Sequence, residues 1–306
     1  MFPRFLALLS AGWWLATAAV AGEQFSVATY NVENYLDTPV PGRTAKSAEA
    51  KARVRDTLLA TRADVLALQE MGSTNALLEL RGALKAAGLD YPHWEHVTGR
   101  DTNIHVAVLS RFPIDARRSH TDDSFLLNGR RFRVSRGFAE VDIRVTPEFQ
   151  FTLLAAHLKS KRPVPEADQA ELREQEALLL REKIDARLKT HPEAPLVVLG
   201  DLNDTRDAKP IRAVIGRGRA ALVDVRPAEA APGKAGAPFQ RLGANVTWTY
   251  FYNREDTYSR FDYALVNRAL AARLVPEQTC VLALPWWREA SDHRPVLLTF
   301  ALGSDR

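Results

Sequence analysis

The sequence predicts an α/β fold in which two packed β-sheets are flanked by helices, within one domain over residues 23–306. Short segments rich in β-branched and aromatic residues recur from end to end, and helix-like segments separate only some of them. Hydrophobic residues make up 46% of the chain, which is ordinary for a globular protein and sufficient for a sizeable core. The length also suits a single large domain.

Strands are expected where β-branched and aromatic residues run between turn residues, because such side chains pack well on a pleated surface. Several of these runs follow a proline, as at Pro195 and Pro295. The expected strands cover residues 25–31, 65–69, 104–109, 132–145 (in two pieces), 149–157, 196–199, 246–250, 261–266, 279–284 and 296–300.

The expected helices cover residues 44–61, 73–87 and 166–189. In the last of these, small or apolar residues recur at spacings of seven and four, while Glu and Arg residues occupy the other face. This pattern is typical of a surface helix packed on a sheet. Thr44 or Ser47 is suited to cap the first helix, and Ser73 the second. The Ala-, Pro- and Gly-rich stretch 227–243 is expected to be a long loop.

The N-terminal segment has the order of a secretory signal peptide. Arg4 supplies a positive charge, a largely apolar run follows over residues 5–20, and small residues surround the end of that run. Residues 1–22 are therefore assigned to a signal peptide with cleavage expected after Ala21, which predicts a secreted or periplasmic protein. An uncleaved anchor is the alternative, although the run is short for a bilayer span of about 20 apolar residues. Both alternatives take the rest of the chain out of the cytoplasm.

The cysteine content excludes a disulfide-stabilised protein, and the net charge leaves a polyanionic substrate possible. Cys280 is the only cysteine, so an intramolecular disulfide framework is excluded. The net charge of +4 permits a polyanionic substrate without arguing for one. The densest basic clusters are Arg130, Arg131, Arg133 and Arg136, followed by Lys159, Lys161 and Arg162.

Polar residues that can bind a metal or move protons lie at or beside the ends of several expected strands. Because strand ends converge at one edge of a sheet, side chains that are distant in sequence can meet there. Carboxylate and amide oxygens suit a hard cation such as Mg²⁺, which stabilises charge on phosphate oxygens and helps to activate water. A histidine beside a carboxylate can transfer protons. The residues concerned are Asn31, Glu70, His157, Asp201, Asn203, Asp262, Asp292 and His293.

Motifs in a fixed order carry a resemblance to a known family. They are Thr29-Tyr30-Asn31-Val32-Glu33-Asn34, Leu68-Gln69-Glu70, Val106-Ala107-Val108-Leu109-Ser110-Arg111, Ala156-His157-Leu158-Lys159-Ser160, Gly200-Asp201-Leu202-Asn203-Asp204, Arg260-Phe261-Asp262-Tyr263 and Ser291-Asp292-His293. The chain resembles the endonuclease/exonuclease/phosphatase superfamily, which includes DNase I-like nucleases, exonuclease III-like enzymes, inositol phosphatases and neutral sphingomyelinases. The resemblance spans essentially the whole mature chain and implies a DNase I-like, four-layer sandwich of two mixed β-sheets flanked by helices.

The resemblance also implies a metal site made of oxygen ligands. Glu70 matches the main metal carboxylate of the family, Asn31 the amide beside the metal, and Asp292 a metal-associated carboxylate. The implied cofactor is Mg²⁺, with Mn²⁺ or Ca²⁺ as alternatives.

The remaining motif residues match the catalytic groups of the family. Asp201 resembles the acid that positions or deprotonates the attacking water, and Asn203 resembles the amide that contacts the phosphate. His293 matches the essential histidine and Asp262 the acid that orients it. His157 matches a histidine of DNase I-like and sphingomyelinase-like members, whereas exonuclease III-like members have a tyrosine at the equivalent point.

Two cations within the motif segments are candidates for binding the substrate. Arg111 and Lys159 can each meet a substrate phosphate, and each can equally form a structural ion pair.

The sequence therefore predicts an exported, metal-dependent phosphoesterase that cleaves phosphodiesters, with nucleic acid as the favoured substrate. A phosphomonoesterase or a sphingomyelinase- or phospholipase C-like enzyme acting on a lipid headgroup is the alternative at the same site. A silent binding domain with this fold is the third hypothesis, and the presence of Glu70, Asp201 and His293 argues against it. No obligate protein partner is inferred, and a monomer is expected. DNA specificity stays open because the chain has no strong basic patch.

Overall fold

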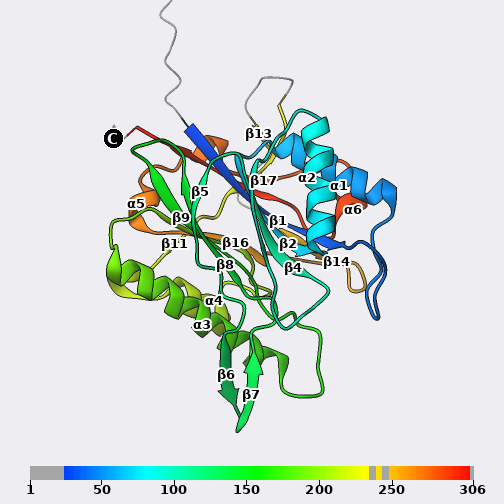
Figure 1. The fold of residues 1–306 in the computed structure, drawn as a ribbon, viewed down its shortest axis with the longest axis vertical. Coiled ribbons are helices and arrows are strands. Elements are labelled where there is room, and N and C mark those ends of the chain that lie inside the picture. The colour runs from blue at the N-terminus through cyan, green and yellow to red at the C-terminus, as the bar shows by residue number, and fades with distance from the viewer. Residues whose placement is uncertain (1–23, 234–238, 243–247, 304–306) are drawn as a thin grey trace, which may run out of the picture.

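The computed structural model describes residues 24–233, 239–242 and 248–303, in which two β-sheets form the centre of the molecule (Figure 1). The eight-stranded sheet contains, in spatial order, β13 (Gln240–Arg241), β12 (Ala228–Ala231), β17 (Cys280–Leu282), β18 (Val296–Ala301), β1 (Gln24–Tyr35), β2 (Val65–Met71), β4 (His105–Ser110) and β3 (His93–Val97). The six-stranded sheet contains β11 (Val223–Asp224), β16 (Asp262–Val266), β10 (Leu196–Asp201), β9 (Gln150–His157), β8 (Phe138–Arg144) and β5 (Ile114–Arg117).

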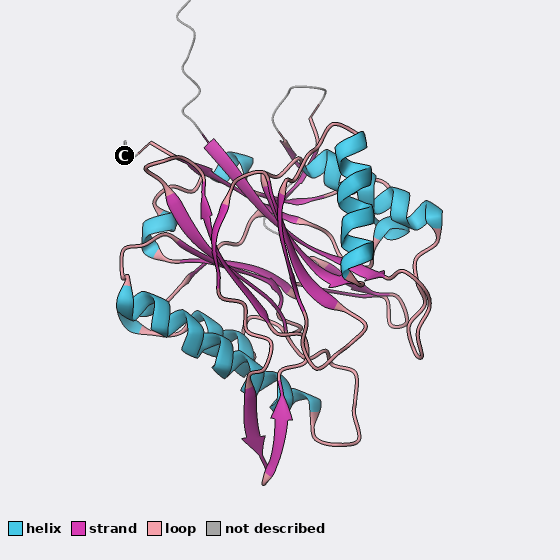
Figure 2. Ribbon diagram, in the orientation of Figure 1, coloured by secondary structure: helices cyan, strands magenta, loops and turns pink. Residues whose placement is uncertain are grey.

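Helices cover the outer face of each sheet (Figure 2). The longest helices beside the eight-stranded sheet are α1 (Ala48–Thr61) and α2 (Thr74–Ala86), with the short α6 (Trp287–Ala290) against α1. Beside the six-stranded sheet lie α3 (Gln169–Thr190) and α4 (Lys209–Ile215). The smaller elements are α5 (Arg268–Ala271), η1 (Gly218–Ala220), η2 (Pro276–Gln278) and the hairpins β6 (Ser124–Leu127)–β7 (Arg130–Arg133) and β14 (Tyr250–Tyr252)–β15 (Thr257–Ser259).

The alternation of side chains along the central strands builds three layers of apolar packing. On β1, Val27 packs between the sheets, whereas its neighbour Ala28 packs under the helices. On β9, Leu153 packs between the sheets and Leu154 packs under α3. Such alternation follows from the two-residue period of a strand and buries both faces of each sheet. The predicted four-layer sandwich of two mixed sheets flanked by helices is thereby confirmed.

The helix starts show where the sequence located elements well and where it did not. Ser47, rather than Thr44, caps α1, and its hydroxyl accepts from the backbone N–H of Ala50. Ser73 caps α2 as predicted. The helix expected from residue 166 begins at Gln169 instead, because the carboxylate of Asp168 accepts from the N–H groups of the first turn.

Two predictions in the C-terminal third were wrong in part. The stretch 227–243, expected to be a loop, contains β12, which pairs in parallel with β17, and β13, which pairs with β12. These two short strands, of which β13 is the edge of the sheet, pair their backbone groups without any apolar alternation that a sequence pattern would detect. The expected strand 246–250 lies partly outside the described residues, and its described part contributes only Tyr250, the first residue of β14.

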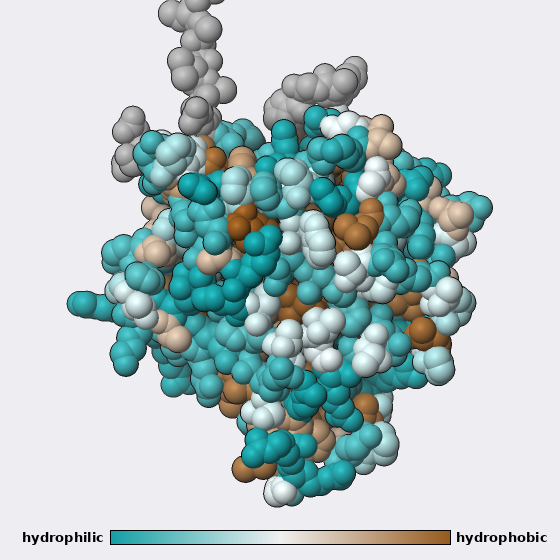
Figure 3. All heavy atoms as spheres, in the orientation of Figure 1, coloured by the Kyte–Doolittle hydropathy of each residue, from teal (hydrophilic) through white to brown (hydrophobic). Residues whose placement is uncertain are grey.

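The signal peptide assigned to residues 1–22 also lies outside the described residues. Within the described part of the chain, no helix is both long and apolar enough to cross a bilayer. The face of the molecule seen in Figure 3 is mainly hydrophilic, with apolar residues in separate small groups.

Candidate active site

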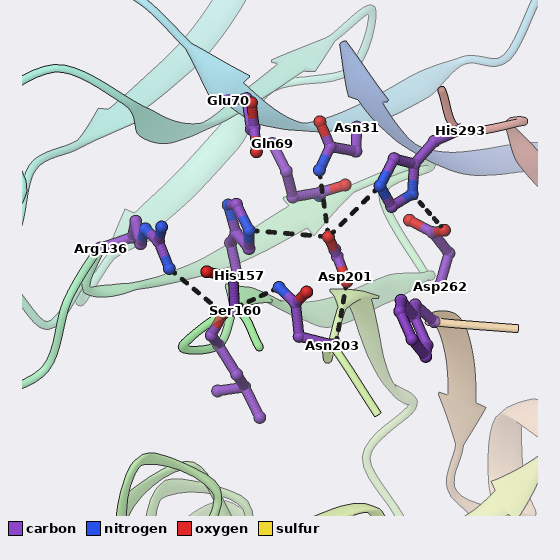
Figure 4. A network of polar contacts seen from close by, with 12 residues as sticks. Asn31, Gln69, Glu70, Arg136, His157, Ser160, Asp201, Asn203, Asp262 and His293 are labelled. Atoms are coloured by element: carbon purple, nitrogen blue, oxygen red, sulfur yellow. Dashed lines mark hydrogen bonds and ion pairs between the residues drawn. The ribbon is translucent and has the colours of Figure 1, made fainter. Parts of the chain in front are cut away.

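The register of the strands collects the motif residues at one edge of the sandwich. In the six-stranded sheet, Asp201 at the end of β10 lies opposite His157 at the end of β9 and opposite Asp262 at the start of β16. Residues paired in this way project from the same face of a sheet. Asn31 of β1, in the other sheet, points toward Asp201 from across the sandwich (Figure 4). The site is therefore assembled from both sheets.

Gly200 allows β10 to approach β9 closely just before Asp201. The φ angle of Gly200 is +134°, a conformation that residues with a side chain rarely adopt. A Cβ atom at this position would lie 1.9 Å from the carbonyl oxygen of Ala156. Only glycine fits this position without a shift of the backbone, which explains the glycine in the Gly-Asp-x-Asn-Asp motif.

The carboxylate of Asp201 is the centre of the polar network. Its Oδ2 accepts from the side-chain amide of Asn31 at 3.0 Å, and its Oδ1 accepts from the backbone N–H of Asn203 at 2.9 Å. The Nε2 atoms of His157 and His293 lie 3.6 and 3.7 Å from the same Oδ2 (Figure 4). Burial raises the pKa of the Asp201 carboxyl, although the nearby His293 opposes the rise.

His293 is held by a buried carboxylate. Its Nδ1 donates to Oδ2 of Asp262 at 2.7 Å, since a carboxylate oxygen can only accept. The opposite ring nitrogen, Nε2, therefore faces the centre of the site. Burial favours the neutral ring, but the carboxylates of Asp262 and Asp201 outweigh it and hold the pKa of His293 well above its usual value.

His157 has the opposite electrostatic setting. Burial, together with the positive charges of Arg136 and His293, holds the pKa of His157 well below its usual value. The two histidines on either side of Asp201 thus favour different protonation states, with His157 neutral and His293 charged.

The loop after β10 is held in a left-handed conformation that presents Asn203. Its φ angle is +55°, and its side-chain amide donates to the carbonyl oxygen of Leu158 at 3.0 Å. Glu33, Asn34 and Glu70 also have positive φ angles, of 47°, 51° and 60°. Such conformations are uncommon for residues other than glycine and tend to gather at functional sites.

The carboxylates of Glu70, near the end of β2, and Asp292, just before β18, lie close enough for their charges to interact. One carboxylate oxygen of Glu70 accepts from the backbone N–H of Asn34 at 3.0 Å, and the guanidinium of Arg43 lies 3.9 Å away. The Asp292 side chain keeps 37% of its surface exposed. Loss of solvent raises the pKa of the Asp292 carboxyl, and the negative charges of Glu33 and Glu70 add to the rise against the opposing effect of His293. Among the described residues, no group of three or more His, Cys, Asp or Glu side chains is arranged to hold a metal.

The predicted substrate-binding cations are placed differently. Arg111 does not join the site, because β4 runs antiparallel to β2 and therefore ends at the opposite edge of the sheet. Its guanidinium instead pairs with Asp64 at 2.8 Å. Lys159 is buried beside the site, and its ammonium donates to the carbonyl oxygens of Ser160 and Arg162.

Sequence reasoning missed residues that organise the site through backbone contacts. The Ser291 hydroxyl donates to the carbonyl oxygen of Asn31 at 2.8 Å and accepts from the N–H of His293 at 3.0 Å, which joins the terminal motif to β1. The Thr249 hydroxyl accepts from the N–H of Asp262 at 3.0 Å. The position of Ser291 within a strong motif was the available signal for it; Thr249 had none.

Comparison with known proteins decides the family. The profile of the Endonuclease/Exonuclease/phosphatase family matches residues 28–293. The chain belongs to this family. Membership supports a phosphoesterase, in agreement with a site in which two histidines, two aspartates and two asparagines meet at or beside strand ends.

Solved structures of other proteins share the fold of this family member. The human nocturnin catalytic domain with bound sulfate is 14% identical, with a TM-score of 0.63 over 91% of this chain and 94% of that one. Sphingomyelinase C from Streptomyces griseocarneus is 19% identical, with a TM-score of 0.60 over 91% and 99%. Truncated TDP2 from Caenorhabditis elegans is 15% identical, with a TM-score of 0.59 over 91% and 98%. No curated protein matches the sequence significantly.

Proposed function

We propose that the protein is an exported, divalent-cation-dependent phosphodiesterase, with nucleic acid as its favoured substrate. The observation that carries this proposal is the buried Asp201 carboxylate, which is held by Asn31 and Asn203 between the rings of His157 and His293. Export rests on the signal-peptide pattern of residues 1–22.

The geometry supports distinct roles for the central residues. Asp201 takes the proton of the attacking water, as its raised pKa suits proton transfer near neutrality. As the oxygen of the water bonds to phosphorus, the bond from phosphorus to the leaving oxygen breaks. The charged His293 donates from Nε2 to a phosphoryl oxygen, while Asp262 fixes the orientation of the ring. The neutral His157 and the side chain of Asn203, both beside Asp201, would contact the phosphate from the other side (Figure 4).

The donor set formed by the C-terminal parts of β1 and β2 and the segment before β18 fits a hard cation. Glu70, Asp292 and Asn31 supply two carboxylates and one amide oxygen, and Mg²⁺ commonly uses one or two carboxylates while keeping several waters. A pair of carboxylates is also compatible with the lack of a larger ligand cluster among the described side chains. A bound cation would stabilise negative charge on the phosphate oxygens. Glu70 and Asp292 would hold it, with Asn31 beside it.

A substrate panel tests the proposal. The mature protein is assayed with Mg²⁺ or Mn²⁺ on plasmid DNA, sphingomyelin and a small phosphate monoester, with and without EDTA. We expect cleavage of DNA that is lost in EDTA and reduced about 10²- to 10⁴-fold in His293→Ala and Asp201→Asn. Asp115→Asn, which changes a surface residue paired with Arg144, is the matched control. Full activity in EDTA would refute the cation dependence, and cleavage of sphingomyelin or the monoester alone would move the substrate to the lipid or monoester class.

A further inference from the structure

A cationic pocket of about 350 Å³ adjoins the candidate active site on the His157 side. It lies between the β6–β7 hairpin and residues 160–166. The carbonyl oxygen of Leu158 connects pocket and site, because it accepts from both the amide of Asn203 and the guanidinium of Arg136. Figure 4 shows Arg136 on the side of the network opposite His293. A ligand group in this pocket would therefore be a neighbour of the phosphate being cleaved.

The floor of the pocket contains cations that are buried. Arg136 is only 5% exposed, and its Nε has no hydrogen-bond partner within the described part of the chain. The nearest carboxylate oxygen, from Asp101, lies 3.7 Å from that Nε. Lys159 is 8% exposed, with its ammonium directed to two backbone carbonyls. A buried guanidinium with an unused donor is costly unless a ligand pairs with it.

Two of the three acidic residues that line the pocket, Glu176 and Asp101, are already engaged, and the third is the exposed Glu166. Glu176 accepts from the backbone N–H groups of Ser135 and Lys159 and from the Ser135 hydroxyl. One oxygen of Asp101 accepts from the N–H groups of Asn103 and Ile104, and the other lies 3.4 Å from the guanidinium of Arg43 and 3.7 Å from that of Arg136. Glu176 is thus used by the loops and Asp101 is shared between a loop and two arginines, whereas Arg100 and Arg162 have no carboxylate partner among the described residues.

The rim of the pocket adds two exposed cations. Arg100 and Arg162 both line it, and neither has a carboxylate within ion-pair distance among the described residues. Phe132, which is 6% exposed, and Leu172 form an apolar wall on the hairpin side. This combination of an anion-binding floor and an apolar wall suits a phosphate attached to an organic group better than a free inorganic ion.

We propose that this pocket is a second phosphate subsite, which makes the enzyme selective for substrates that carry another phosphate next to the cleaved one. The inference rests on the proposed phosphodiesterase function and assigns its substrate to oligonucleotides. Arg136 and Lys159 supply positive charge at the floor of the pocket, and Arg100 and Arg162 contact the second phosphate from the rim.

Matched dinucleotides test the subsite. The wild-type enzyme with Mg²⁺ is assayed on thymidylyl-thymidine, whose single phosphate is the cleaved one, and on the same dinucleotide with an added 5′- or 3′-phosphate. We expect the added phosphate, at one of the two ends, to raise kcat/KM about tenfold, the effect of one charge-assisted contact. The double variant Arg100→Ala/Arg162→Ala should lose that gain and leave cleavage of the unphosphorylated dinucleotide within about twofold. Arg212→Ala/Arg217→Ala, which removes equal charge from another surface pocket, is the control.

The outcomes separate the subsite from the proposed function. Equal kcat/KM for all three dinucleotides, or an equal loss on all of them in the rim variant, would overturn the subsite while the phosphodiesterase stands. An equal loss in the control variant would assign the effect to general charge and would also overturn it. No cleavage of any dinucleotide by the wild type, with DNA also uncut in the panel, would reject the proposed function and the subsite together.

Discussion

The substitution Asp262→Asn removes the charge that holds His293 while it preserves the size of the side chain. The contact is a buried hydrogen bond of 2.7 Å between an imidazole N–H and a carboxylate. Hydrogen bonds to charged groups contribute about 1.5–3 kcal/mol. Because about 1.4 kcal/mol corresponds to a factor of ten, we expect kcat to fall about 10- to 150-fold. KM should change little, since the side chain of Asp262 is fully buried and contacts His293.

A double-mutant cycle with His293→Ala distinguishes positioning from a structural effect. If Asp262 acts through His293, the double variant should be no slower than His293→Ala alone. Steady-state assays on the best substrate of the panel give kcat and KM for all four proteins, and circular dichroism confirms that each is folded. A wild-type kcat in Asp262→Asn, or a loss that multiplies fully with that of His293→Ala, would refute the assignment.

Three further predictions concern the scaffold. Gly200→Ala should lower the free energy of unfolding by about 3 kcal/mol in urea titrations, because its Cβ would meet the Ala156 carbonyl and its φ is strained; an unchanged midpoint would contradict this. Arg111→Ala should change kcat/KM by no more than about twofold and lower the free energy of unfolding by less than about 1 kcal/mol. A decrease in kcat/KM well beyond twofold would show that Arg111 contributes to the site. Burial disfavours the charged forms of Glu140 and Asp142, but hydrogen bonds from cationic partners prevail and lower both pKa values. The stabilisation that these two carboxylates give is present above their unfolded pKa values and is lost as pH falls through the lowered ones. The difference in Tm between wild type and Glu140→Gln/Asp142→Asn should therefore become smaller from about pH 6 to pH 3. A difference that stays constant over this range would contradict the prediction.

The sequence predicted the fold and most of the candidate site because both depend on where strands end. Apolar runs located the central strands, and the residues after them include Glu70, Asp201 and Asn203. The direction of a strand is a different matter. Arg111 follows β4 just as Glu70 lies near the end of β2, yet the antiparallel pairing sends Arg111 to the opposite edge. A pattern locates the end of a strand but does not tell which edge of the sheet that end reaches.

Tertiary placement also decided which basic residues belong together. In the sequence, Arg136 lies in a cluster with Arg130, Arg131 and Arg133, and nothing in residue type or charge distinguishes these four arginines. The structure separates them, because Arg130, Arg131 and Arg133 are exposed on β7 whereas Arg136 is buried beside Leu158. Burial of a cation depends on the packing of elements distant in sequence, so single-sequence reasoning had no means of finding it.

The network around Asp201 also depends on the distance between the two sheets. Its hydrogen bond from Asn31 joins β1 of the eight-stranded sheet to β10 of the six-stranded sheet, and the bond from His293 joins the segment just before β18 to β16. A separation or slide of about one ångström would bring either bond outside hydrogen-bond geometry while leaving each sheet intact. Neither sheet by itself carries the whole candidate site. Heating, pressure or a cavity between the sheets should therefore abolish activity under conditions in which the secondary structure is still intact.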